Sequence, residues 1–64
     1  MTASIIFGTE KITVSAGITI EAAMLSCGKF PDAFLFFFNG RPIPMTTALK
    51  DNDVVEAMRV ASGG

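Results

Sequence analysis

The stretch "AFLFFFNGRPIP", residues 33–44, decides how the chain folds. Its first half is an apolar, aromatic run that favours a β-strand. Asn39 and Gly40 follow, and both tolerate positive φ, so the pair favours a tight hairpin turn. Pro42 and Pro44 come next, and because proline has no N–H to donate, the returning strand should be short and lie at a sheet edge. The stretch therefore predicts a hairpin of one long and one short strand.

The aromatic run also divides into two faces, because successive side chains of a strand point to opposite sides of the sheet. One face receives Phe34, Phe36 and Phe38. The other receives Leu35 and Phe37. We expect the three phenylalanines to face the core and the other two side chains to point outward.

An earlier hairpin is predicted near the beginning of the chain. The segments "SIIF" (residues 4–7) and "KITV" (residues 11–14) are rich in β-branched residues, which favour strands. They are separated by a short turn in which Gly8 can adopt a left-handed conformation at little cost. Two antiparallel strands therefore precede the rest of the fold.

A helix is predicted between the two hairpins, over residues 20–27. Apolar residues recur there at the i, i+3, i+4 and i+7 spacing of one helical face, namely Ile20, Ala23, Met24 and Cys27. Thr19 is a suitable N-cap, and Glu21 complements the positive end of the helix dipole. Gly28 and Pro31 end the helix. On this apolar face Cys27 is expected to be a small buried residue and not a reactive thiol.

The remaining segments complete a two-layer α+β domain. Residues 45–53 form a polar loop, with Leu49 as its expected anchor in the core, and residues 54–60 form the last strand. A short helix can cover only one face of the resulting sheet of four or five strands. We assign residues 1–60 to one domain and residues 61–64, "ASGG", to a flexible C-terminal tail.

Composition argues against several classes of function. The chain of 64 residues has no histidine, which removes the commonest general base and metal ligand, and its single cysteine cannot build a thiolate metal site. The net charge is −1 with scattered basic residues, which argues against nucleic-acid binding. No apolar run approaches the ~20 residues of a membrane-spanning helix. We expect a cytoplasmic protein that is not an enzyme and binds neither metal nor cofactor.

Several of these features together resemble one family. They are the early hairpin, a helix opening with "TIE", the motif "FPD", a strand ending in "NGRPIP", and "LKDNDVVE" followed by a terminal "RVASGG". The chain resembles the ubiquitin-like β-grasp sulfur carriers: the thiamine-pathway carrier, the small subunit of molybdopterin synthase, and the small archaeal modifier proteins. The resemblance covers nearly the whole chain. It implies a β-grasp fold, in which a mixed sheet wraps one helix.

The resemblance also implies chemistry at Gly63 and Gly64. A partner adenylating enzyme, similar to ubiquitin-activating enzymes, would activate the Gly64 carboxylate with Mg-ATP. The acyl-adenylate would then give a thiocarboxylate for cofactor synthesis or tRNA thiolation, through sulfur-transfer enzymes, or an isopeptide bond to target-protein lysines. Residue chemistry agrees, because a terminal carboxylate is ionised at neutral pH and reacts poorly until activated. Glycine also shields its carbonyl least. The alternative is a noncovalent ubiquitin-like interaction module with an idle tail.

The predicted outward face suggests where a partner would bind. If Glu56 points to solvent, then Val54, Met58 and Val60 share its face of the last strand. Together with Leu35 and Phe37 they would form exposed apolar surface beside the root of the tail, and such surface usually marks a binding site. The expected partner-binding residues are Leu35, Phe37, Met58 and Val60. A second subunit or another segment covering this face is the alternative.

Overall fold

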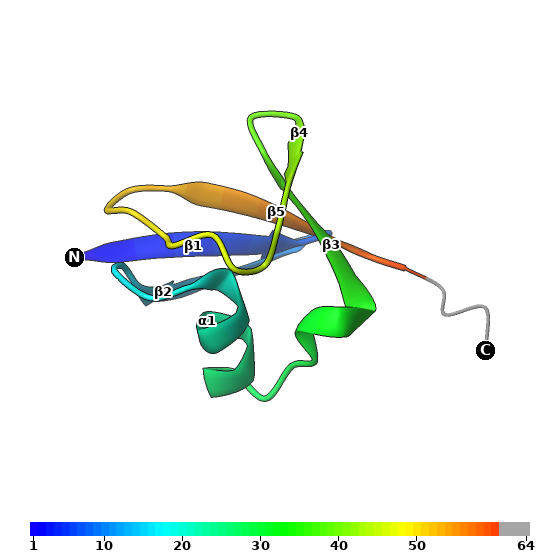
Figure 1. Ribbon diagram of the computed structural model, residues 1–64, viewed down its shortest axis with the longest axis horizontal. Coiled ribbons are helices and arrows are strands. Elements are labelled where there is room, and N and C mark those ends of the chain that lie inside the picture. Colours follow the sequence, from blue (N-terminus) through cyan, green and yellow to red (C-terminus); the bar gives the residue numbers. More distant parts are fainter. Residues whose placement is uncertain (61–64) are drawn as a thin grey trace.

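Two strands from opposite ends of the chain lie side by side at the centre of the sheet (Figure 1). They are β1 (Thr2–Phe7) and β5 (Val54–Arg59), which pair in parallel in the computed structural model, whose described residues are 1–60. The sheet has five strands in the order β2-β1-β5-β3-β4. The remaining strands are β2 (Glu10–Ser15), β3 (Phe34–Phe38) and β4 (Arg41–Ile43).

Both predicted hairpins are present. β2 pairs antiparallel with β1, and β3 pairs antiparallel with both β4 and β5, so the sheet is mixed. Gly8 has φ 61° in the first turn, and in the second turn Asn39 has φ 53° and Gly40 has φ 79°. Both turns therefore use positive φ, as predicted. The strand after the second turn is a three-residue edge strand that includes Pro42, as the prolines required.

Helix α1 (Ile20–Ser26) lies against one face of the sheet (Figure 1). The Thr19 hydroxyl accepts a hydrogen bond from the backbone N–H of Ala22 at 3.1 Å, which confirms the predicted N-cap. A short 3-10 helix, η1 (Pro31–Ala33), leads from the helix into β3. The architecture is thus α+β, with a mixed five-strand sheet and one α-helix within the described residues.

The prediction that Cys27 is buried is wrong. The helix ends at Ser26, Cys27 is its C-cap, and the cysteine side chain is exposed. The buried face of the helix consists of Ile20, Ala23 and Met24. The i+7 position of that face falls where the chain is already leaving the helix toward Gly28, whose φ is 76°. The apolar spacing in the sequence therefore extends one residue beyond the helix, and the residue at that position is not buried.

The core lies between the helix and the face of the sheet that the helix covers. Phe36 is buried, and Phe34 and Phe38 pack against the same cluster, as the alternation in β3 predicted. Leu49 is 2 % exposed and joins this cluster from the loop before β5. The buried hydrophobic residues of this core are Ala3, Ile5, Val14, Ile20, Ala23, Met24, Phe36, Leu49, Val55 and Ala57.

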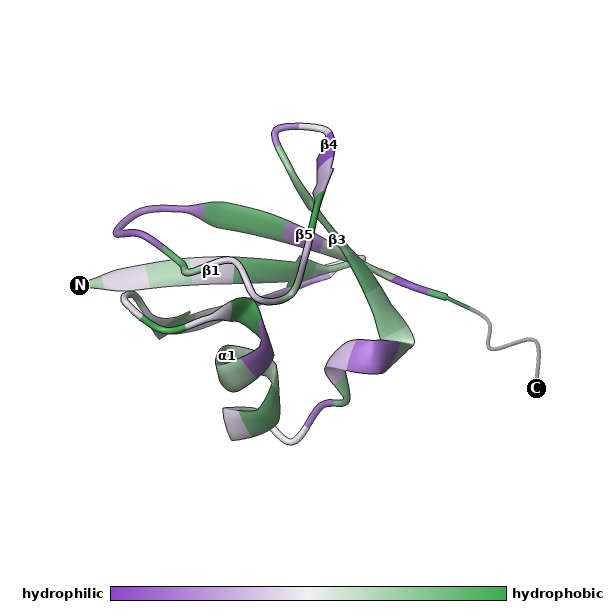
Figure 2. Ribbon diagram, viewed as in Figure 1, coloured by the Kyte–Doolittle hydropathy of each residue, from purple (hydrophilic) through white to green (hydrophobic). Residues whose placement is uncertain are grey.

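The loop that carries Leu49 is tied to the rest of the fold by its backbone. The Leu49 N–H donates to the Ile18 carbonyl at 2.8 Å, and the Leu49 carbonyl accepts from the Gly17 N–H at 2.8 Å. Figure 2 shows hydrophobic residues along β1, β3 and β5, and hydrophilic residues in the part of this loop next to β5. Among residues 1–60 no helix has the length and apolar character that crossing a membrane requires. The tail predicted at 61–64 lies outside the described residues.

Leu49→Ala should lower the free energy of unfolding by about 2–5 kcal/mol, because it opens a cavity in the core. Leu25→Ala is the matched control, since Leu25 is 58 % exposed on the helix and its loss should cost no more than about 0.5 kcal/mol. Urea denaturation followed by circular dichroism measures both values. Equal losses in the two variants would contradict the assignment of Leu49 as the loop's anchor.

Candidate functional site

The sheet face opposite the helix carries exposed apolar side chains at its centre. Leu35 in β3 is 49 % exposed and Met58 in β5 is 59 % exposed. The antiparallel register places these two residues directly opposite each other. Cross-strand partners on one face have Cβ atoms about 4.5–5.5 Å apart, so the two side chains form continuous apolar surface. The prediction that they point outward is confirmed.

The other predicted partner-binding residues lie on the same face but are less exposed. Phe37 is half-buried and stands between Pro42 of β4 and Glu56 of β5 in the register. Val60 is also half-buried, whereas Val54 is 42 % exposed. We call the apolar residues on this face of β3 and β5, together with the residue that follows β5, the outer patch. They are Leu35, Phe37, Val54, Met58 and Val60. Glu56 lies between Val54 and Met58 on this face of β5. Its carboxylate therefore interrupts the apolar surface of the outer patch.

The strand that leads to the C-terminal segment is held on both sides. β5 pairs with β1 over residues 54–57 and with β3 over residues 56–59. Beyond the strand, the Val60 N–H donates to the Ala33 carbonyl at 3.0 Å. Val60 is therefore the fixed point from which residues 61–64 continue. Gly63 and Gly64, the predicted reactive residues, lie outside the described residues.

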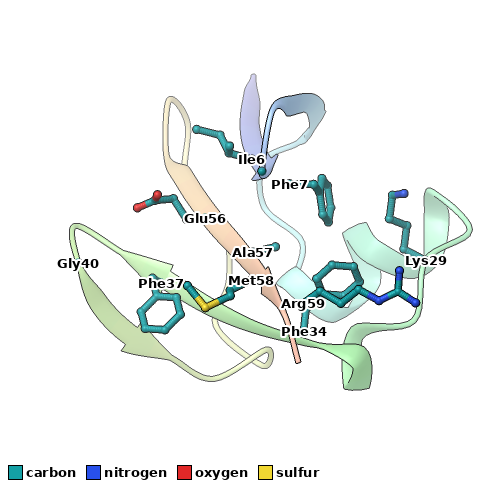
Figure 3. A pocket seen from close by; sticks show the side chains of 11 residues that line it. Ile6, Phe7, Lys29, Phe34, Phe37, Gly40, Glu56, Ala57, Met58 and Arg59 are labelled. Atoms are coloured by element: carbon teal, nitrogen blue, oxygen red, sulfur yellow. The ribbon is translucent and has the colours of Figure 1, made fainter. Parts of the chain in front are cut away.

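A cleft of about 680 Å³ opens where β1 ends beside the last residues of β5 (Figure 3). Figure 3 shows β5 passing between two groups of side chains. Toward the outer face lie Ile6, Phe37, Glu56 and Met58, and toward the helix side lie Phe7, Lys29, Phe34 and Arg59. The cleft therefore joins the outer patch to a second, more basic surface.

We name this second surface the notch and define it as Phe7, Lys29, Phe34 and Arg59. The rings of Phe7 and Phe34 meet edge to face, with centroids 5.4 Å apart and planes at 76°. Lys29 Nζ lies 5.1 Å from the centroid of Phe7, within the range of a cation–π contact. Arg59 stands opposite Phe34 in the strand register. The notch is thus an aromatic floor with two cations beside it.

The sequence contained only part of this arrangement. Ile6 could have been assigned to the outer face, because it alternates with the buried Ile5. No local pattern predicts the notch, because Phe7, Lys29 and Phe34 come from the end of β1, the loop after α1 and the start of β3. Their proximity depends on how the sheet and the helix region pack together.

The outer patch is apolar, and the notch combines two aromatic rings with two cations. Among residues 1–60 no three His, Cys, Asp or Glu side chains are grouped so that they could hold a metal ion. Comparison of the chain with the models of known protein families, and with curated protein sequences, gives no match. The resemblance to the β-grasp sulfur carriers therefore stays a prediction from the sequence motifs.

Leu35→Lys should change the free energy of unfolding by no more than about 1 kcal/mol, because its side chain is half exposed on the outer patch. Phe36→Lys places the same charge in the core and should leave the chain unfolded at neutral pH, since an unpaired buried charge is very costly. Circular dichroism and one-dimensional NMR of the two variants report this difference. A folded Phe36→Lys variant, or an unfolded Leu35→Lys variant, would show that the faces of β3 are assigned the wrong way round.

Proposed function

We propose that this chain is a ubiquitin-like β-grasp protein whose Gly64 carboxylate is adenylated by a partner activating enzyme. The observation that carries the proposal is the position of the last strand. β5 is the central strand of the sheet, is paired on both sides, and leads directly into the segment that ends in Gly63-Gly64. The parallel pairing of β1 with β5, beside two antiparallel hairpins and one helix, is compatible with the β-grasp fold.

A fixed strand that leads to the C-terminal segment suits a protein whose terminus is the substrate of another enzyme. Residues 60–64 span at most ~17 Å when extended, enough for the terminal carboxylate to enter an active site while the domain stays outside. A diglycine end has no side chain beyond Cα, so it fits a narrow channel. In the activating enzyme the carboxylate oxygen would attack the α-phosphorus of Mg-ATP, and pyrophosphate would leave.

The acyl-adenylate then has two possible acceptors. Hydrosulfide-level sulfur, delivered by a sulfur-transfer enzyme, would attack the Gly64 carbonyl, form a C–S bond and break the C–O bond to AMP. The product is a thiocarboxylate that can donate its sulfur. A lysine amine of a target protein would instead form an isopeptide bond, with AMP or a carrier thiol as the leaving group. The carboxylate chemistry is shared up to this point, so a cytoplasmic sulfur carrier and a protein modifier are both consistent with the proposal.

The outer patch is the proposed docking surface for the activating enzyme. Its apolar side chains lie on β5, which leads to the tail, and on the neighbouring strand β3. A protein bound there would therefore hold the beginning of the tail close to its own surface. Contiguous exposed apolar surface on a small domain is a common mark of a binding site. Glu56 within the patch offers one carboxylate for a matching cation on the partner.

Chain purified from its native host should contain a fraction in which one oxygen at the C-terminus is replaced by sulfur, as measured by intact-mass spectrometry. A variant that ends at Gly63 should lack this form. Larger covalent adducts that also disappear in the shortened variant would identify protein modification. If removal of Gly63 and Gly64 changes neither the mass forms nor cellular function, the tail is idle and the chain is a noncovalent interaction module.

Phe37→Lys should weaken capture of the activating enzyme by the chain, by about tenfold or more, while leaving the chain folded. Lysine is preferred to aspartate here because Phe37 lies opposite Glu56, where a second carboxylate would also destabilise the sheet. Thr13→Lys is the matched control, since it adds the same charge at an exposed position of β2. Capture from host lysate is measured by quantitative mass spectrometry. Equal capture by both variants would exclude the outer patch as the docking surface.

A further inference from the structure

The last residue of β5 has an open backbone edge on one side. Pairing between β1 and β5 ends at Phe7 and Ala57, because the chain turns away at Gly8 into β2. β5 nevertheless continues to Arg59 and stays paired with β3. The notch therefore begins at the end of β1. It lies beside the space that β1 would fill if it continued along β5.

The direction of the open groups follows from the hydrogen-bond pattern. Val60 N–H donates toward β3, to Ala33, so its neighbour Arg59 directs its N–H and C=O the other way, toward the line of β1. Within residues 1–60 no backbone hydrogen bond joins Arg59 to the chain beyond Phe7. One donor and one acceptor of Arg59 thus face the line of β1 together, as an unpaired strand edge presents them.

The side chains around this edge select what can pair with it. The notch places the edge-to-face pair of Phe7 and Phe34 on the helix side, with Lys29 above the Phe7 ring. Arg59 adds a second cation on the same side (Figure 3). Ile6 and Met58 lie on the outer side of β5, where an apolar side chain is accommodated.

We infer that the notch binds an extended segment of a partner polypeptide, which adds to β5 in the line of β1 and carries apolar and acidic side chains. An extended peptide offers both an acceptor and a donor to one residue of a strand edge, which a simple anion does not. Its alternate side chains face the notch, where an apolar residue contacts the Phe7–Phe34 pair and a carboxylate contacts Lys29 and Arg59. This inference goes beyond the proposed function and does not rest on it.

A short capped peptide tests the inference on the full chain alone. In Ac-Asp-Val-Leu-Val-Asp-NH2 the leucine and both aspartates share one side, so the pattern suits either strand direction. Titrated into ¹⁵N-labelled chain, this peptide should shift the amide signals of Gly8 and Arg59 most. The charge-reversed peptide Ac-Lys-Val-Leu-Val-Lys-NH2 should bind at least tenfold more weakly. So should the acidic peptide with N-methylated leucine and valines, which lacks the donor N–H groups for either strand direction.

Variants of the chain locate the contact. Lys29→Gln and Arg59→Gln should each weaken binding of the acidic peptide about three- to tenfold, whereas Lys11→Gln, at an exposed position of β2, should leave it unchanged. Circular dichroism spectra equal to that of the parent chain verify that each variant is folded. The inference is overturned if the acidic peptide gives no shifts at millimolar concentration, if the charge-reversed peptide binds equally well, or if the largest shifts fall on Leu35 and Phe37.

Discussion

The parallel pairing of β1 with β5 is the contact on which the rest of the structure depends. It joins the first and last strands of the chain at the centre of the sheet, and it places Ile5 beside Val55 in the core. On its other side β1 pairs with β2. On its other side β5 pairs with β3, which in turn pairs with β4. Because β5 is central, the segment after it starts from a strand that is paired on both sides.

A second consequence comes from the size of the helix. The single α-helix among the described residues has 7 residues, and it covers one face of a five-strand sheet. The covered face supplies the core, including Phe36 and Leu49. The opposite face keeps Leu35 and Met58 exposed, where a larger domain would have a second layer to bury them. The outer patch thus consists of apolar residues of the sheet that no second layer covers among the described residues.

The elements of the fold were predictable because their signals are local. Turn chemistry at Gly8 and at Asn39-Gly40, the Thr19 cap, and the alternation in residues 34–38 each act over a few neighbouring residues. Cys27 shows the limit of such reasoning. Its spacing matched the buried face of the helix, but burial needs a neighbouring surface, and at Cys27 the chain has already turned away. Periodicity reports which residues share a face, and packing decides how far that face is covered.

The sequence by itself determined the order of elements and the two faces of β3, because these depend on the properties of adjacent residues. Only the tertiary structure decided that β5 lies between β1 and β3, and that Phe7, Lys29 and Phe34 meet at its end. Those contacts join residues far apart in the chain, so no local pattern encodes them. They arise because strand pairing and burial of the apolar face are satisfied together, and that joint requirement exists only in the folded chain.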